Sequence, residues 1–308
     1  MYNLKTSAKI VMDSLIDGLR VTTFEVSFPR FILPELNTHR VFSRNSASSR
    51  ARSIKRTFAE VMESPFYPHP FTKNQKGMSG QFVDDELQEE AQQYWLQARD
   101  SAVLSALDLL VGQAKRKELI GDKVEDYESV IQAYSMHEDS PSIHKQHLNR
   151  LLEPFMYHTA IITASMWDNF FKLRIADDAQ PEIHELAILM KEAFDASKPV
   201  ERDWHLPYMD YDEVSMWDIK RSAASCASVS YKSPSEINDA AVERIFTSMF
   251  EEFHMSPFEH QALSPNKLDE LLEIMDWKLA DKPENLDLHG NLSKGIVQLR
   301  KVMEHLEK

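Results

Sequence analysis

The most informative stretch of this chain is THRVFSRNSASSR, residues 38–50. It lies in a basic segment. Between Leu36 and Ala59 there are six Arg and Lys residues and five serines, but no Asp or Glu. The whole chain carries a net charge of −14, so its surface repels polyanions and only a local basic segment can hold an anionic ligand. We expect a helix from Ser46 onward, whose first N–H groups would attract a phosphate, with Arg50 one turn in. A solvated basic helix face would have the same composition.

Hydrophobic patterning around this segment predicts a mixture of strands and helices. Apolar and β-branched residues alternate at period two over residues 20–33, which is typical of a strand with one buried face. We expect strands at 8–13, 20–33 and 226–231. Longer periodic stretches predict helices at 46–64, 84–118, 140–150, 155–174, 179–197, 238–253, 266–279 and 292–307. The predicted fold class is α+β.

Composition limits the classes of function. The length of 308 residues allows two domains, and we expect one part at 1–200 and another at 201–308, joined into one integrated unit. Seven glycines assemble neither a GxGxxG loop nor a P-loop. The acidic net charge argues against a nucleic-acid partner. The chain has one cysteine, no apolar signal core and no run long enough to span a membrane, so we expect a cytoplasmic protein with no membrane partner.

The order of residues 38–50 resembles the signature of the flavin-dependent thymidylate synthases, RHRxxSxNExSxRY. Six positions match at unchanged spacing: His39, Arg40, Ser43, Asn45, Ser48 and Arg50. Three positions depart from the family, since Thr38 replaces an Arg, Ser46 a Glu and Ala51 a Tyr.

Further segments carry the same resemblance. Residues 167–186 (WDNFFKLRIADDAQPEIHEL) are similar to the family's NFxxLRxxxxAQxEIxxLA, and Arg150 precedes Pro154 as in an Arg-x-x-x-Pro of the family. Residues 222–231 (SAASCASVSY) and 254–260 (HMSPFEH) resemble two elements that normally precede the signature. The Gln-containing stretch 290–301 is similar to a strand that also normally precedes it. The chain therefore resembles a rearranged, phage-type member of the family, with a mixed or antiparallel sheet and long helices.

The resemblance implies a ligand for each matched residue. It implies an FAD site formed by His39, Arg40, Ser43, Asn45, Asn169, His254 and His260. It implies that Arg174 contacts the pyrimidine base and is the catalytic group. The nucleotide phosphate would be held by Ser48, Ser49, Arg50 and Arg150. NADPH and methylenetetrahydrofolate would be co-substrates, and a homo-oligomer, tetramer or dimer, would be expected.

The implied reaction is methylation of dUMP at C5, giving dTMP, by an FAD-dependent thymidylate synthase-like methyltransferase. Two alternatives stay open because of the departures at Thr38, Ser46 and Ala51. One is hydroxymethylation of dUMP or dCMP, and the other is a non-catalytic nucleotide-binding homologue. Arginine only donates hydrogen bonds, so Arg174 favours the carbonyl of uracil over the amino group of cytosine.

Other candidate residues have a simpler interpretation. His144 and His147 lie three apart on a predicted helix, but no third ligand is suitably spaced, so we expect no metal site. Cys226 lies among small residues and is interpreted as a buried structural thiol. Trp204, in the predicted loop WHLPY, is a candidate for stacking on a flavin or folate ring.

Overall fold

The computed structural model describes residues 5–74, 81–135, 143–229 and 234–307. A five-stranded sheet lies at its centre, with strand order β3-β4-β2-β1-β5. Its strands are β1 (Ser7–Ile16), β2 (Leu19–Pro29), β3 (Ser43–Ser46), β4 (Tyr157–Ala164) and β5 (Val200–Glu201). All neighbours pair antiparallel except β1 and β5. The predicted α+β class with a mixed sheet is therefore confirmed.

The two predicted N-terminal strands are present as a hairpin. Asp17 and Gly18 connect them, and both have positive φ, 47° and 80°. An Asp-Gly pair with positive φ at both positions suits the tight hairpin turn between twisted strands. The second strand ends earlier than predicted, at Pro29, where the chain enters a 3-10 turn (Arg30–Ile32) and α1 (Leu33–Leu36).

The helix predicted over 155–174 is wrong in its first half. Residues Tyr157–Ala164 form the strand β4, and only Asp168–Arg174 form a helix, α7. β4 lies between β2 and β3 and is almost wholly buried, so its apolar residues follow one another without alternating. A continuous apolar run of this kind does not distinguish a strand from a buried helix.

The helix predicted from Ser46 also begins later. Ser46 pairs with Ala160 as the last residue of β3, and α2 (Ile54–Glu63) begins after Ser53. Arg50 therefore lies in a turn before the helix and not inside it.

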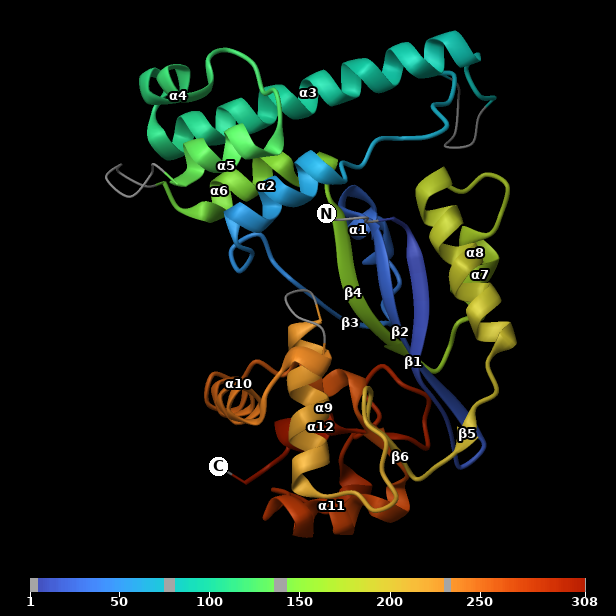
Figure 1. Cartoon of the computed structure of the whole chain (residues 1–308). Helices are drawn as coiled ribbons and strands as arrows, with labels where there is room; N and C mark the ends of the chain where they lie inside the picture. Colours follow the sequence, from blue (N-terminus) through green and yellow to red (C-terminus); the bar gives the residue numbers. More distant parts are fainter. Residues whose placement is uncertain (1–4, 75–80, 136–142, 230–233, 308) are drawn as a thin grey trace.

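A helical layer occupies one end of the sheet (Figure 1). It contains α2, α3 (Asp85–Val111), α4 (Gln113–Ile120), α5 (Tyr127–Ser135) and α6 (Lys145–Leu152). The Asp84 side chain caps α3 by accepting from the Leu87 N–H, and Gly112, with φ of 86°, divides the predicted 84–118 helix into two. The helix predicted at 140–150 is observed as α6, which begins at Lys145. Residues 140–142 of the prediction lie outside the described ranges. These helices share one apolar core.

Helices α7 and α8 (Pro181–Ala196) lie beside β1 and β2 (Figure 1). Their apolar side chains and those of the strands form a second core, which includes Phe24, Phe28, Trp167 and Phe170. Residue Arg174, at the end of α7, is thereby placed beside the segment that follows α1.

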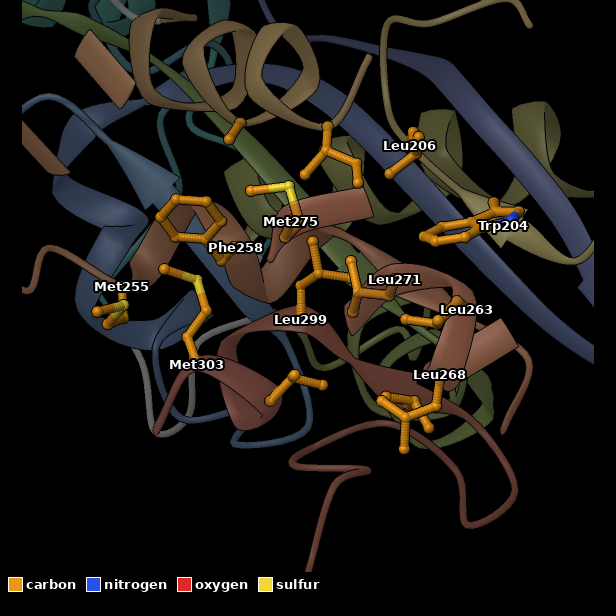
Figure 2. Packing of buried hydrophobic residues seen from close by; sticks show 14 of the residues in the cluster. Trp204, Leu206, Met255, Phe258, Leu263, Leu268, Leu271, Met275, Leu299 and Met303 are labelled. Carbon is orange, nitrogen blue, oxygen red and sulfur yellow. The ribbon is translucent and has the colours of Figure 1, made fainter. Parts of the chain in front are cut away.

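The C-terminal part packs below the sheet (Figure 1). It contains α9 (Met216–Ser228), α10 (Asp239–Glu251), α11 (Leu268–Met275) and α12 (Leu299–Glu304) around a small sheet of β6 (Trp204–His205), β7 (Ala262–Leu263) and β8 (Val297–Gln298). Figure 2 shows its apolar core, which includes Trp204 with 4% of its surface exposed. Trp204 is therefore a core residue and not a stacking platform.

Two further sequence predictions in this part are wrong. The strand predicted at 226–231 is the end of the helix α9 and residues beyond it, of which 230 and 231 lie outside the described ranges. A capping box between Ser215 and Asp218 starts this helix, and small side chains allow it to pack closely. The helix predicted at 292–307 contains the strand β8 before α12. In the described residues, no helix combines the length and apolarity needed to cross a bilayer.

Candidate functional site

Arg174 links two of the sequence segments identified above. Its Nε donates to His39 Nε2 at 2.9 Å and its Nη2 to Thr38 Oγ1 at 3.3 Å, and its Nη1 forms an ion pair with Glu35. The side chain is largely buried. A guanidinium has five N–H groups, so two of them remain for a ligand.

His39 is a buried, neutral ring. It stacks on Phe42 with centroids 5.5 Å apart and meets Phe170 edge-on at 5.0 Å. Burial, followed by the charges of Arg174 and Arg44, lowers the pKa of His39 to about 4. Because its Nε2 accepts from Arg174, His39 orients that guanidinium.

Strand β3 contains two matched polar residues that bind other parts of the chain. Ser43 Oγ donates to Asn291 Oδ1 at 3.1 Å and accepts from Gln298 Nε2 at 3.3 Å. Asn45 Nδ2 donates to the carbonyl of Cys226 at 2.8 Å. The structure thus places Ser43 and Asn45 at the contact between the large sheet and the C-terminal part.

The SPFEH segment, Ser256–His260, is a 3-10 turn that packs against β3 and β4. This placement brings a late segment of the chain next to the signature strand. Glu259 pairs with Arg300, and burial raises the pKa of its carboxyl. His254 lies at the surface beside Glu252, whereas His260 is fully buried. The two histidines therefore differ in environment, one at the surface and one in the interior.

His260 belongs to a buried chain of hydrogen bonds. Its Nδ1 lies 2.8 Å from Thr163 Oγ1, which lies 2.6 Å from Thr23 Oγ1. Thr23 Oγ1 lies 2.7 Å from His205 Nε2, and His205 Nδ1 lies 2.8 Å from Ser14 Oγ. Burial lowers the pKa of both histidines to about 3, so both rings are neutral near pH 7.

The turn between β3 and α2 contains the residues predicted to hold a phosphate. Ser48 and Arg50 are exposed, whereas Ser49 is buried. On α6, Arg150 is exposed and the preceding Asn149 is fully buried. Asn149 Nδ2 donates to the carbonyls of Ser49 and Arg52 at 2.8 and 3.1 Å, so α6 packs directly on this turn.

Several predicted ligand-binding side chains are exposed and make no hydrogen bond or ion pair with the residues that the structure describes. They are Arg40, Arg50, Arg150 and Asn169. Asn169 and Arg174 share α7, and five residues of helix turn them about 140° apart. Positively charged and amide donors of this kind suit phosphate and pyrophosphate oxygens.

Four cavities within the described residues have volumes from about 300 to about 750 Å³. None of these four is lined by Arg40, Arg50, Arg150 or Asn169.

The remaining candidates are structural. Cys226 is buried and burial raises the pKa of its thiol, which agrees with the predicted structural role. His144 caps α6, its Nδ1 accepting from the Gln146 N–H at 3.2 Å. Sequence reasoning missed Glu35 and Asn149, because neither belongs to a matched string and their partners are fixed only by the fold.

Comparison with models of protein families identifies the family of this chain. A model described as "Thymidylate synthase complementing protein" matches residues 19–200. That range covers more than half of the chain and includes both the signature and the α7 segment. The chain belongs to this family. The later SPFEH segment lies outside the matched range.

Comparisons with curated proteins and with solved structures are less informative. No curated protein matches the chain. Among solved structures the chain is similar to a UMP/dUMP methylase, PolB from Streptomyces cacaoi, whose crystal structure was determined with bound 5-Br UMP. The similarity has a TM-score of 0.43 at 16% sequence identity and covers 62% of this chain and 89% of that chain.

Proposed function

We propose that this protein is a flavin-dependent thymidylate synthase, which transfers a one-carbon unit from methylenetetrahydrofolate to C5 of dUMP and gives dTMP. Family membership supports this reaction. The observation that supports this function most strongly is the hydrogen bond from Arg174 to His39. These residues come from two separate matched strings, and the fold joins them at 2.9 Å.

In this proposal Arg174 binds the base. His39 and Glu35 hold its guanidinium in place, and its two remaining N–H groups donate to a uracil carbonyl. Such a donor stabilises the negative charge that develops on the carbonyl oxygen as the ring is activated, before C5 forms its new bond. Because Arg174 cannot accept a hydrogen bond, cytosine is a poorer partner.

The nucleotide phosphate would lie at the turn before α2. Arg50 and Arg150 would pair with its oxygens, and the Ser48 hydroxyl would donate to it. Ser49 is buried, so its backbone, and not its hydroxyl, would contribute to phosphate binding. These side chains are available because they have no partner among the described residues.

The residues present fit part of the predicted flavin site. Arg40, Asn169 and His254 are exposed polar donors, suited to the oxygens of FAD. The other four predicted flavin-site residues instead bind other residues of the chain and would support the site without contacting FAD: His39, Ser43, Asn45 and His260. Bound FAD would supply the reducing equivalents, with NADPH as their source.

Exposed donors without a partner among the described residues suit a site shared between subunits. We propose that exposed donors of one subunit face those of another in a homotetramer or homodimer, with the ligands between them. The division into parts at 1–200 and 201–308 stays a prediction, as do the individual residue roles.

The alternatives make different products or none. Without the family's Glu at position 46, a hydroxymethyl group on dUMP or dCMP is the second candidate reaction. A nucleotide-binding protein without activity is the third.

A flavin titration tests the proposal against the non-catalytic alternative. We expect the purified protein, with added FAD, to show protein-bound flavin absorbance that shifts when dUMP is added. A protein that binds dUMP but no flavin would support the non-catalytic nucleotide-binding alternative, and one that binds neither would overturn both.

A further inference from the structure

The turn of residues 47–53, between β3 and α2, is closed by its own backbone. The Ala51 and Arg52 N–H groups both donate to the Ser48 carbonyl, at 3.0 and 3.3 Å. This turn has no regular secondary structure of its own, so neighbouring side chains determine how its peptide groups are oriented.

Besides Thr57 of α2, whose Oγ1 donates to the Ser53 carbonyl at 3.1 Å, three side chains from other elements hold this turn by its carbonyl groups. Asn149 binds the carbonyls of Ser49 and Arg52 at 2.8 and 3.1 Å. Lys145 Nζ reaches the Ala51 carbonyl at 3.3 Å and Arg30 Nη1 the Ala47 carbonyl at 3.4 Å. Among the three, Asn149 is fully buried and makes the shortest contact.

Because the peptide bond is planar and trans, these contacts to the carbonyls also fix the direction of the N–H groups that follow them. In a trans peptide the N–H of residue i+1 points opposite to the carbonyl of residue i. When Asn149 fixes the Ser49 and Arg52 carbonyls on the buried side, the N–H groups of Arg50 and Ser53 point the other way. Arg50 and Ser53 are exposed, and neither N–H has a hydrogen-bond partner among the described residues.

We propose that Asn149 is a positioning residue for nucleotide phosphate. Through the carbonyls of Ser49 and Arg52 it holds the 47–53 turn so that the Arg50 and Ser53 N–H groups, together with the Arg50 side chain, face the phosphate. The inference rests on the proposed function, because it assumes that this turn receives the 5′-phosphate. It adds a residue that never touches the nucleotide.

The chemistry of Asn149 fits a donor role. Its Oδ1 is buried and has no partner within the described residues, so the amide contributes only its N–H groups. Aspartate has the same shape but cannot donate and would place a negative charge against two carbonyl oxygens.

The test compares binding of dUMP and of deoxyuridine, which lacks the phosphate, to the FAD-supplemented full-length protein. We expect Asn149→Ala to weaken dUMP binding about ten-fold, equal to one or two lost hydrogen bonds, and to leave deoxyuridine binding unchanged. Asn149→Asp should lose more of the dUMP affinity. In turnover, KM for dUMP should rise while kcat is retained.

Leu148→Ala is the matched control. Leu148 is buried in the helical core on the same helix, so its loss destabilises α6 without removing a hydrogen bond to the turn. The ratio of the two affinities should stay at the wild-type value in this variant, even where its Tm is lower.

The outcomes separate this inference from the proposed function. If the wild type binds dUMP and Asn149→Ala keeps the wild-type affinity ratio, the positioning role is wrong and the proposed function stands. If Leu148→Ala changes the ratio as much as Asn149→Ala does, Asn149 acts only through stability. If the wild type does not bind dUMP, both proposals fail.

Discussion

Arg174 illustrates how one side chain receives its orientation from several directions. Burial alone would make an unpaired guanidinium costly, and the fold surrounds it with an anion, a neutral imidazole and a hydroxyl. Thr38, which replaces an arginine of the family signature, supplies the hydroxyl. An arginine at position 38 would bring a second positive charge to this place, so the departure is compatible with a firmly held Arg174.

Removing Arg174 should abolish most of the proposed activity. We expect Arg174→Ala to lower kcat/KM for dUMP at least about 100-fold, the effect typical of losing one donor to developing negative charge. Steady-state turnover measures this. Lys172→Ala, on an exposed position of the same helix, should keep wild-type kinetics, and an Arg174→Ala enzyme of near-normal kcat/KM would contradict the assigned role.

At the residue scale the sequence was informative where a motif exists. The spacing of THRVFSRNSASSR pointed to Arg50 and Ser48, which are exposed in the structure. The same motif did not reveal that Ser43, Asn45 and His39 bind other residues of the chain. Those contacts depend on residues such as Cys226 and Asn291, which are more than 180 positions away.

At the scale of elements, the hardest feature to predict was the step from β3 to α2. Polar, serine-rich residues fit a capped helix start as well as an edge strand, and local propensity is a weak guide when pairing decides. Pairing of Ser43–Ser46 with β4 overrides the helical tendency. The turn that results, and not a helix N-terminus, carries Ser48 and Arg50.

The histidine–threonine chain joins the two sheets and predicts how stability depends on pH. Burial lowers the pKa of His205 and His260 to about 3, below the value of about 6.5 for an unfolded chain. The unfolded state then binds more protons between these limits. Stability is therefore fully present above about pH 6.5 and is lost as the pH falls toward about 3.

Chemical denaturation at several pH values tests this dependence. Each histidine contributes a slope of up to about 1.4 kcal/mol per pH unit in the unfolding free energy. A His205→Gln variant should show a shallower slope between about pH 6 and pH 4 than the wild type. His254→Gln, at an exposed position, should not change it, and equal slopes for all three proteins would contradict the account.

At the scale of the whole molecule, segments far apart in sequence converge on β3. The SPFEH turn packs against it, and Gln298 of β8 donates to Ser43. The sequence suggested that elements normally preceding the signature come later here, and the structure brings these two beside the signature strand. Their order in the chain could be read from the motifs, but their contacts required the fold.

The exposed donors predict that one chain is not the complete unit. We expect light scattering to give a mass that is a multiple of 35.7 kDa, two-fold or four-fold, under conditions in which the protein binds dUMP. A monomer that turns over dUMP at full rate would show that the open surface of a single chain is sufficient.

The mass of the reaction product tests the central claim most directly. The protein would be incubated with dUMP, methylenetetrahydrofolate, NADPH and FAD, and the nucleotide weighed by mass spectrometry. We predict a product heavier than dUMP by one CH₂ unit, which is dTMP, and none when FAD is omitted from flavin-free protein. A product heavier by CH₂O would show hydroxymethylation, and unchanged dUMP in the presence of bound flavin and folate would contradict the proposed synthase.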